Sequence, residues 1–166
     1  MIATIRPLQE NDQTLLEEML YLALWLPPGQ PPFPRDIIKL PELSRYVANW
    51  GRLAGDCGFV AETPSSEPLG AVWLRLIPPP GGYGFVNAST PELSMALFPK
   101  YRNLGIGSRI MTEILSFSRS RFQTISLSVA TANPAVRLYR RFGFEQQEDH
   151  GDSLLMILSL QSRDRL

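Results

Sequence analysis

The sequence predicts an α/β protein of the α+β type, with a mixed, mostly antiparallel sheet of about seven strands and helices on both faces. Two observations support this class. Short runs rich in β-branched and aromatic residues alternate with segments whose apolar residues recur at helical spacing. Prolines and glycines separate these runs at short intervals. With 166 residues the chain is long enough for one core and short for two, so we expect a single domain over residues 1–166.

The first third of the chain is predicted to be mainly helical. A short strand at 2–6 precedes a helix that Asn11 or Asp12 can cap. The proline-rich segment 27–34 ends this helix and forms an extended loop, because each proline fixes φ and lacks an amide donor. A second helix is expected after Pro41, with apolar residues at i, i+3, i+4 and i+7. These residues are Leu43, Tyr46, Val47 and Trp50.

The remaining two thirds are predicted to contain most of the strands. The first two form an antiparallel hairpin joined by a Pro/Ser turn. Asn133 caps the last helix and Gly143 ends it. His150 lies in EDHGD, which is typical of a polar turn between two strands. The expected elements are strands at 57–62, 69–77 and 92–98, a helix from Ile106 to Phe117, a strand at 124–130, a helix at 133–144 and a strand at 154–160.

Composition argues against several classes of function. Sixteen Lys and Arg balance sixteen Asp and Glu, so there is no excess of cations to neutralise nucleic-acid phosphates. The longest apolar run, residues 19–26, is far below the roughly 18 residues that span a bilayer, and it follows two glutamates instead of a basic segment. The single cysteine, Cys57, and the single histidine, His150, argue against disulfide and zinc chemistry. We therefore expect a cytoplasmic protein without bound metal, and without a membrane or nucleic-acid partner.

The stretch LFPKYRNLGIGSRIM, residues 97–111, joins a predicted strand to a predicted helix through two glycines. Unpaired amides at a helix N-terminus attract anions, so this junction is a candidate phosphate site. A nucleoside-triphosphate P-loop is excluded because no Lys follows Gly105 or Gly107. A dinucleotide fingerprint is excluded because Ile110 occupies the third glycine position and no acidic residue follows at the required spacing.

Two segments carry a family resemblance. Residues 102–107, RNLGIG, resemble the R/Q-x-x-G-x-G/A signature of the GNAT superfamily of acetyl-CoA-dependent N-acetyltransferases. Residues 133–144, NPAVRLYRRFGF, resemble its second cofactor segment, in which an Asn opens a helix, a Leu-Tyr pair follows and Gly-Phe ends it. The element order fits this family over 2–160. The resemblance implies the GNAT acyltransferase fold, in which the strand at 92–98 diverges from that at 124–130 and acetyl-CoA, the co-substrate, lies in the gap.

The resemblance also implies the cofactor contacts. Backbone amides of the glycine loop would cradle the pyrophosphate, since glycine lets the backbone approach closely. The preceding strand would pair with the pantetheine arm as an added strand pairs with a sheet edge. Asn103 and Leu104 depart from the common form, where Gly and a basic residue are frequent, so the loop has one cation fewer. The expected cofactor-binding residues are Leu97, Phe98, Arg102, Asn103, Leu104, Gly105, Ile106, Gly107, Ser108 and Asn133.

Acetyl transfer to an amine requires a base for the ammonium and an acid for the leaving thiolate. Tyr139 matches the family position whose hydroxyl often protonates the sulfur, although an aromatic residue at helical spacing is also typical of a core. Glu92 matches a position that often carries the base, although an acid at a strand edge is usually solvated; ordered water is the alternative base. His150 is not expected to be catalytic. A solvated surface sufficiently explains the three arginines on the helix of Tyr139.

Trp25, Phe33, Arg35 and Asp36 belong to the segment that commonly shapes the acceptor pocket in this family, although it can also be a simple connection. The sequence thus predicts an N-acetyltransferase acting on a primary amine of a small molecule, or on a protein N-terminus or lysine. Two alternatives stay open: a catalytically silent acyl-CoA-binding regulatory module, and a structural protein without a ligand. The exposed late strands could pair across a homodimer.

Overall fold

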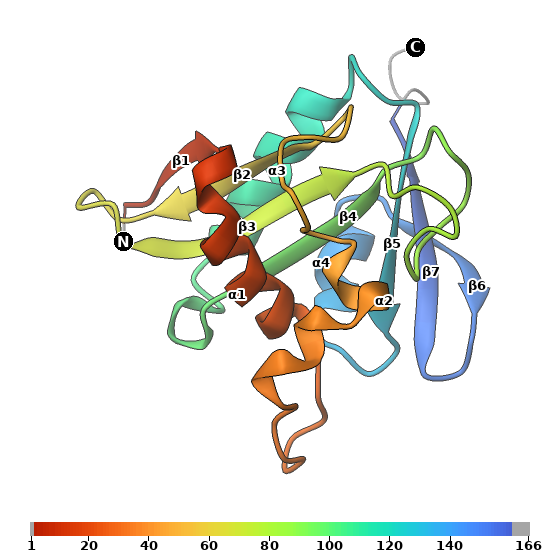
Figure 1. Cartoon of the computed structure of the whole chain (residues 1–166), viewed down its shortest axis with the longest axis horizontal. Helices are drawn as coiled ribbons and strands as arrows, with labels where there is room; N and C mark the ends of the chain where they lie inside the picture. The colour runs from red at the N-terminus through yellow and green to blue at the C-terminus, as the bar shows by residue number, and fades with distance from the viewer. Residues whose placement is uncertain (1, 161–166) are drawn as a thin grey trace.

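The computed structural model describes residues 2–160 and contains one seven-stranded sheet in the order β1-β2-β3-β4-β5-β7-β6 (Figure 1). All neighbouring strands are antiparallel except β4 and β5, which are parallel. The predicted mixed, mostly antiparallel sheet is confirmed. The strands are β1 Thr4–Pro7, β2 Cys57–Glu62, β3 Pro68–Arg75, β4 Glu92–Leu97, β5 Thr124–Ala130, β6 Glu145–Asp149 and β7 Ser153–Ser159. The helices are α1 Gln13–Ala23, α2 Pro41–Ser44, α3 Ile106–Ser118 and α4 Ala135–Arg141, with 3₁₀ turns at Glu10–Asp12, Arg35–Lys39 and Pro99–Tyr101.

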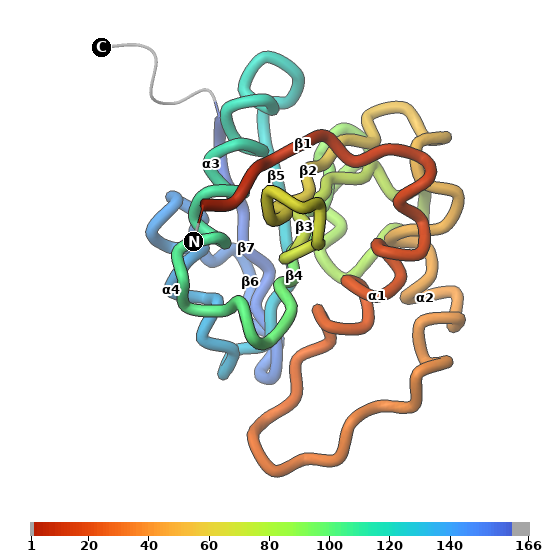
Figure 2. Tube along the Cα trace, turned by 90° about the vertical axis from the view of Figure 1, so that its left-hand side faces the viewer, coloured from red at the N-terminus to blue at the C-terminus, as the bar shows by residue number. Residues whose placement is uncertain are grey.

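Helices cover both faces of the sheet, with α1 and α2 on one side and α3 and α4 on the other (Figure 2). The alternation of side chains along each strand divides the core accordingly. On β3, Ala71 and Trp73 pack against α1, while Val72 and Leu74 pack against α3. The sheet therefore has two distinct apolar layers, one on each face.

The two central strands diverge after a single paired position. Glu92 at the start of β4 pairs with Ser126 of β5, and Ser126 donates its N–H to the carbonyl of Pro91 at 3.0 Å. Beyond this point β4 pairs only with β3 among the described strands. The predicted splayed central pair is confirmed. We call the shape formed by the diverging strands β4 and β5 the V, and its paired end at Glu92 and Ser126 the apex.

The second predicted helix is shorter than its apolar spacing suggested. α2 ends at Ser44, and the chain continues as turns. Side chains of β3 bind the carbonyls that a longer helix would use: Arg75 donates to the carbonyl of Ala48 at 2.7 Å, and Trp73 Nε1 donates to that of Tyr46 at 3.1 Å. The expected apolar residues are still buried or half-buried, so the pattern reported burial correctly and helix length incorrectly.

The caps differ from the prediction at one helix and agree at another. At α1, neither candidate forms a side-chain cap; Asp12 instead forms an ion pair with Arg6 at 2.8 Å and accepts the N–H of Gln9. At α4, Asn133 Oδ1 accepts the N–H of Ala135, the first helical residue, at 2.9 Å. Within residues 2–160, no helix is long and apolar enough to cross a membrane.

Candidate active site

The glycine loop connects β4 to α3 through two residues with positive φ. Asn103 has φ +61° and Gly105 has φ +82°. Glycine adopts such a conformation without strain, and Asn is among the few other residues that tolerate it. The departure from glycine at position 103 therefore preserves the shape of the loop. Leu104, the other departure, is exposed and adds no charge.

The start of α3 presents backbone amides without partners. Among residues 2–160, no acceptor binds the N–H groups of Ile106, Gly107 or Ser108. The first turn also lacks an acidic residue and a side-chain cap. Such a helix start carries a partial positive charge and free donors, which suit an anion such as a pyrophosphate.

Two arginines flank these amides. Arg102 donates its Nε to the carbonyl of Leu97 at 3.2 Å, and its terminal nitrogens have no partner among residues 2–160, so they can bind an anion. Arg141, at the end of α4, reaches Ser108 Oγ at 3.3 Å. Arg141 is one of the three arginines of this helix that were expected to form a solvated surface, and that run of arginines was the only sequence feature that could have indicated a place beside the loop.

The open edge of β4 continues from the apex to this loop. The N–H of Phe98 points to β3, where it bonds the carbonyl of Leu69 at 3.0 Å. Backbone groups alternate in direction along an antiparallel strand, so those of Leu93, Met95 and Leu97 point to the side of β5. Leu97 was expected to pair with a pantetheine arm and points the right way, whereas Phe98 does not. Met95 was missed because strand alternation cannot be assigned before the pairing is known.

Tyr139 lies in the α3/α4 layer of the core, with its ring 5.9 Å from that of Phe144 in an edge-to-face arrangement. Burial raises the pKa of Tyr139 to about 12. With this pKa the hydroxyl stays protonated at neutral pH. Because it has no hydrogen-bond partner among residues 2–160, it is free to donate. Its helix, α4, lies beside the start of α3: a Cβ added to Gly107 would be 3.5 Å from Leu138 Cδ2.

Glu92 is buried at the apex, with 2% of its surface exposed. Its Oε2 accepts the N–H of Gly82 at 2.8 Å. Its Oε1 accepts the N–H of Gly84 at 2.8 Å and the hydroxyl of Tyr46 at 3.1 Å. Glu92, the candidate base, is therefore a buried carboxylate whose two oxygens both accept hydrogen bonds, and not the solvated charge that is usual at a strand edge. No periodic signal in the sequence links Tyr46 to Glu92, so sequence reasoning missed this partner.

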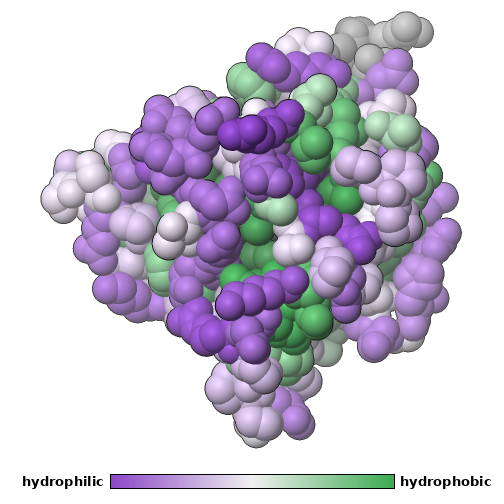
Figure 3. Space-filling model, viewed as in Figure 1, coloured by the Kyte–Doolittle hydropathy of each residue, from purple (hydrophilic) through white to green (hydrophobic). Residues whose placement is uncertain are grey.

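The proline-rich segment lies below the sheet in Figure 1, between α1 and α2. Trp25 and Phe33 are half-buried, and the Phe33 carbonyl accepts the Tyr21 hydroxyl at 2.6 Å. Arg35 does not extend freely toward the V: it forms an ion pair with Glu18 at 2.6 Å and lies over the Tyr21 ring at 4.3 Å. Figure 3 shows apolar surface exposed in the middle of this face with hydrophilic residues around it.

The sequence matches the model of the family described as "Acetyltransferase (GNAT) family" over residues 19–144, more than half of the chain. The chain belongs to the GNAT acetyltransferase family. The predicted acetyltransferase and its fold are thereby confirmed at the level of the family, whose members use acetyl-CoA. A comparison with curated proteins finds no match.

Solved GNAT structures share the fold over nearly the whole chain. A GNAT-family acetyltransferase from Streptococcus pneumoniae has a TM-score of 0.66 and 17% identity, covering 95% of this chain and 99% of that one. The ribosomal-protein-S18-alanine N-acetyltransferase from Escherichia coli has a TM-score of 0.66 and 16% identity, covering 99% of both chains. Spermidine N-acetyltransferase from Vibrio cholerae, solved with CoA and spermine, has a TM-score of 0.61 and 18% identity, covering 95% of both. At these identities the likeness shows the fold alone.

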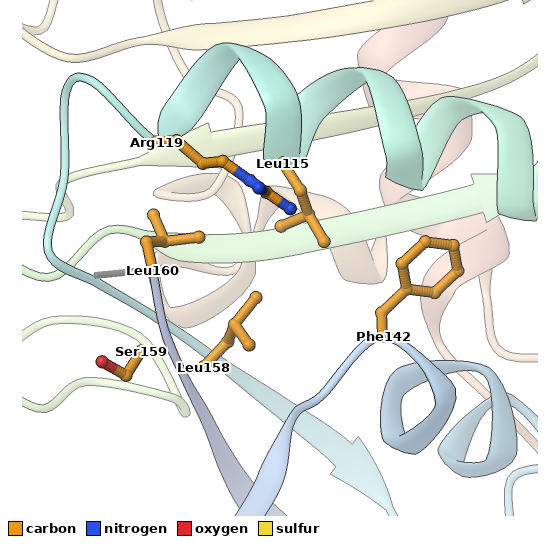
Figure 4. Close-up of a pocket in the computed structure, with 6 residues that line it drawn as sticks. All are labelled: Leu115, Arg119, Phe142, Leu158, Ser159 and Leu160. Atoms are coloured by element: carbon orange, nitrogen blue, oxygen red, sulfur yellow. The ribbon is translucent and has the colours of Figure 1, made fainter. Parts of the chain in front are cut away.

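A small cavity of about 30 Å³ lies apart from the glycine loop and the open edge of β4 (Figure 4). It is near the C-terminal end of α3, roughly 20 Å along the helix from the glycine loop at 1.5 Å per residue, and has room for about one water molecule. Its lining residues are Leu115, Arg119, Phe142, Leu158, Ser159 and Leu160. His150 is also outside the site, at the β6–β7 turn, 3.1 Å from Glu148 Oε2. Among residues 2–160, no group of three or more His, Cys, Asp or Glu is placed to hold a metal ion, and a metal-free enzyme stays a prediction.

Proposed function

We propose that the chain transfers an acetyl group from acetyl-CoA to a primary amine of a small molecule or peptide. The observation that carries this proposal is the continuity of the open β4 edge with the unpaired amides of α3. An extended arm with amide groups fits the edge, and a phosphate fits the helix start. Acetyl-CoA, which members of the matched family use, has both an arm with amide groups and a pyrophosphate.

The cofactor would be held along its length by this chain's backbone. The N–H groups of Ile106, Gly107 and Ser108 would bind the pyrophosphate, with Arg102 and Arg141 adding two cations. Arg141 would replace the basic residue missing from position 104. Met95 would offer its N–H and carbonyl, and Leu97 its N–H, to the pantetheine amides, while the Leu97 carbonyl accepts Arg102 Nε.

The transfer reaction needs a group that protonates the leaving sulfur and a group that takes the proton of the amine. Acetyl-CoA, when bound, supplies a thioester carbonyl that a neutral amine can attack, forming a C–N bond as the C–S bond breaks. Tyr139 would give its proton to the leaving sulfur. The sequence left Glu92 and ordered water as alternative bases. Because both Glu92 oxygens already accept hydrogen bonds from the protein, we favour transfer of the amine proton to water.

The acceptor is proposed only as a class. The Escherichia coli enzyme is an N-acetyltransferase of a ribosomal-protein alanine and the Vibrio cholerae enzyme one of spermidine, so the fold occurs with both peptide and small-molecule amines. Trp25 and Phe33 are proposed to contact the acceptor. A cytoplasmic location, a single domain over residues 1–166 and a homodimer stay predictions.

The experiment is a thiol-release assay with purified protein, acetyl-CoA and a panel of polyamines, aromatic amines and short peptides. At least one acceptor should release coenzyme A thiol at a rate above that of acetyl-CoA alone, and mass spectrometry should find the acetylated amine. Coenzyme A binding without turnover on any acceptor would support the silent binding module instead. Neither binding nor turnover would contradict both.

A further inference from the structure

The connection from β3 to β4, residues 76–91, is long for a hairpin and carries an exposed tyrosine at a fixed position. In Figure 1 it runs in front of β5, on the face that α1 and α2 cover. Tyr83 lies within it, with 62% of its surface exposed, between Gly82 and Gly84. Loops of this length without regular structure are usually mobile or functional, so the restraints on this one are informative.

Four hydrogen bonds hold the backbone on both sides of this tyrosine. Glu92 accepts the N–H groups of Gly82 and Gly84, each at 2.8 Å. Ser126 Oγ donates to the carbonyl of Gly84 at 2.6 Å. The N–H of Tyr83 itself donates to the Tyr46 hydroxyl at 2.7 Å. We call Glu92 and Tyr46 the clamp.

The clamp has defined donors and acceptors. Burial and the neighbouring Glu92 carboxylate both raise the pKa of Tyr46, so its hydroxyl keeps its proton. The proton is donated to Glu92 Oε1, and a lone pair accepts the N–H of Tyr83. Gly82 and Gly84 cannot be replaced easily. A Cβ added to Gly82 would lie 2.5 Å from Glu92 Oε1, and one added to Gly84 would lie 3.2 Å from it.

The clamped segment lies over the apex of the V. Glu92 and Ser126, which bind it, are the one paired position between β4 and β5. A Cβ on Gly84 would also lie 3.1 Å from the backbone N of Ser128, so the segment contacts β5 just beyond the apex. This is the end of the open β4 edge opposite the phosphate-binding loop, six strand residues or about 20 Å away.

We propose that Tyr83 is a specificity-determining residue that forms one wall of the acceptor site, and that Glu92 is a positioning residue that holds it there through the clamp. This inference rests on the proposed function: with the pyrophosphate at the start of α3 and the pantetheine arm along β4, the acetyl end of the cofactor would lie toward the apex. An aromatic ring on a rigid backbone offers apolar area and a π-face to an amine at little entropic cost. A binding group needs such support from its surroundings, and the clamp supplies it.

The test measures steady-state kinetics with the best acceptor of the amine panel, together with the Kd of coenzyme A from calorimetry. Tyr83→Ala should raise the acceptor KM about tenfold and leave the Kd of coenzyme A within twofold of wild type. Tyr83→Phe should stay close to wild type, because the ring makes the contact. Val86→Ala, an exposed residue of the same connection, is the matched control and should change neither value.

The clamp is tested with Tyr46→Phe, which removes the hydroxyl that holds Tyr83 and keeps the ring. It should raise the acceptor KM severalfold with kcat nearly unchanged. Glu92→Gln should act in the same direction. If Glu92→Gln instead lowered kcat by 100-fold or more on every acceptor and removed a limb of the pH profile, Glu92 would be the base and the positioning role would be wrong.

The remaining outcomes separate this inference from the proposed function. Turnover by the wild type with an unchanged acceptor KM in Tyr83→Ala would overturn the inference alone. Absence of turnover in the wild type on the whole panel would overturn the proposed function, and the inference with it.

Discussion

Tyr139 combines a buried ring with a hydroxyl that has no hydrogen-bond partner among residues 2–160. Because burial raises its pKa to about 12, the hydroxyl is a proton donor throughout the neutral range. Tyr139→Phe should therefore lower kcat about 100-fold or more, the usual contribution of a general acid. For the wild type, kcat measured from pH 6 to 10 should show no falling limb from this tyrosine, because it loses its proton only near pH 12.

Stability provides the control for this substitution. The ring packing against Phe144 is preserved in Tyr139→Phe, and the lost hydroxyl leaves no partner unsatisfied among the described residues. Thermal unfolding should shift by no more than about 2 °C, which corresponds to less than about 1 kcal/mol. A wild-type kcat in Tyr139→Phe would exclude the tyrosine as the acid.

Arg141 is predicted to contribute to cofactor affinity through charge. Its guanidinium lies 3.3 Å from Ser108 Oγ, next to the free amides of α3. Arg141→Gln should weaken coenzyme A binding about threefold to tenfold in calorimetry and leave binding of pantetheine, which lacks the phosphates, unchanged. Arg137→Gln on the same helix is the control, because Arg137 has no hydrogen bond to the loop in the described structure. Equal losses in both variants would indicate only a general effect of charge.

Single positions show which features of the site a local sequence pattern can encode and which it cannot. The glycine loop is a local motif, and its backbone shape follows from residues next to each other, including Asn103 at φ +61°. The clamp joins Tyr46 to Glu92, 46 residues apart, through one hydroxyl. No local pattern encodes that contact, so the sequence singled out Glu92 as a candidate base but did not reveal its burial or its partner Tyr46.

At the scale of elements, a buried ion pair connects β3 to the turns that follow α2. The side chains of Arg75 and Asp56 are each 2% exposed and form two hydrogen bonds at 2.9 and 3.0 Å. The Arg75 guanidinium also binds the carbonyl of Ala48 and lies 5.3 Å from the Trp50 ring. In a continuous helix the carbonyl of Ala48 would accept a hydrogen bond from the helix backbone. Here the buried Arg75, held by Asp56, takes that place, and this accounts for the short α2. A buried arginine is invisible to hydrophobic periodicity, and this explains the error in helix length.

Asp56→Ala should destabilise the protein strongly, because it leaves the Arg75 charge buried without its partner. We expect the free energy of unfolding in urea to fall by about 3–5 kcal/mol, the usual cost of breaking a buried pair from one side. Glu18→Gln breaks the more exposed pair with Arg35 and should leave the free energy of unfolding nearly unchanged. Comparable losses in the two variants would contradict a special role for burial.

At the scale of the whole molecule, the order of elements, the mixed sheet and the splayed β4–β5 pair followed from the sequence. The apolar patterns indicated which residues are buried, and the two segments that resemble the family led to the family that the comparison confirms. The long β3–β4 connection was read only as a break between strands. Its position over the apex depends on hydrogen bonds from three elements, which become visible only when the sheet is assembled.

Cofactor binding should be measurable as stabilisation of the whole fold. A ligand that binds only the folded state at 100 times its Kd adds about 2.7 kcal/mol, which corresponds to a rise in Tm of roughly 5–10 °C for a protein of this size. Coenzyme A should produce this rise in a thermal-shift measurement, and pantetheine at the same concentration should produce much less, because the phosphates bind the amides of α3 and its flanking arginines. High salt should reduce the shift by screening Arg102 and Arg141, since both guanidiniums lie at the surface. An unchanged Tm with millimolar coenzyme A would mean that the free amides at Ile106, Gly107 and Ser108 do not form a phosphate site.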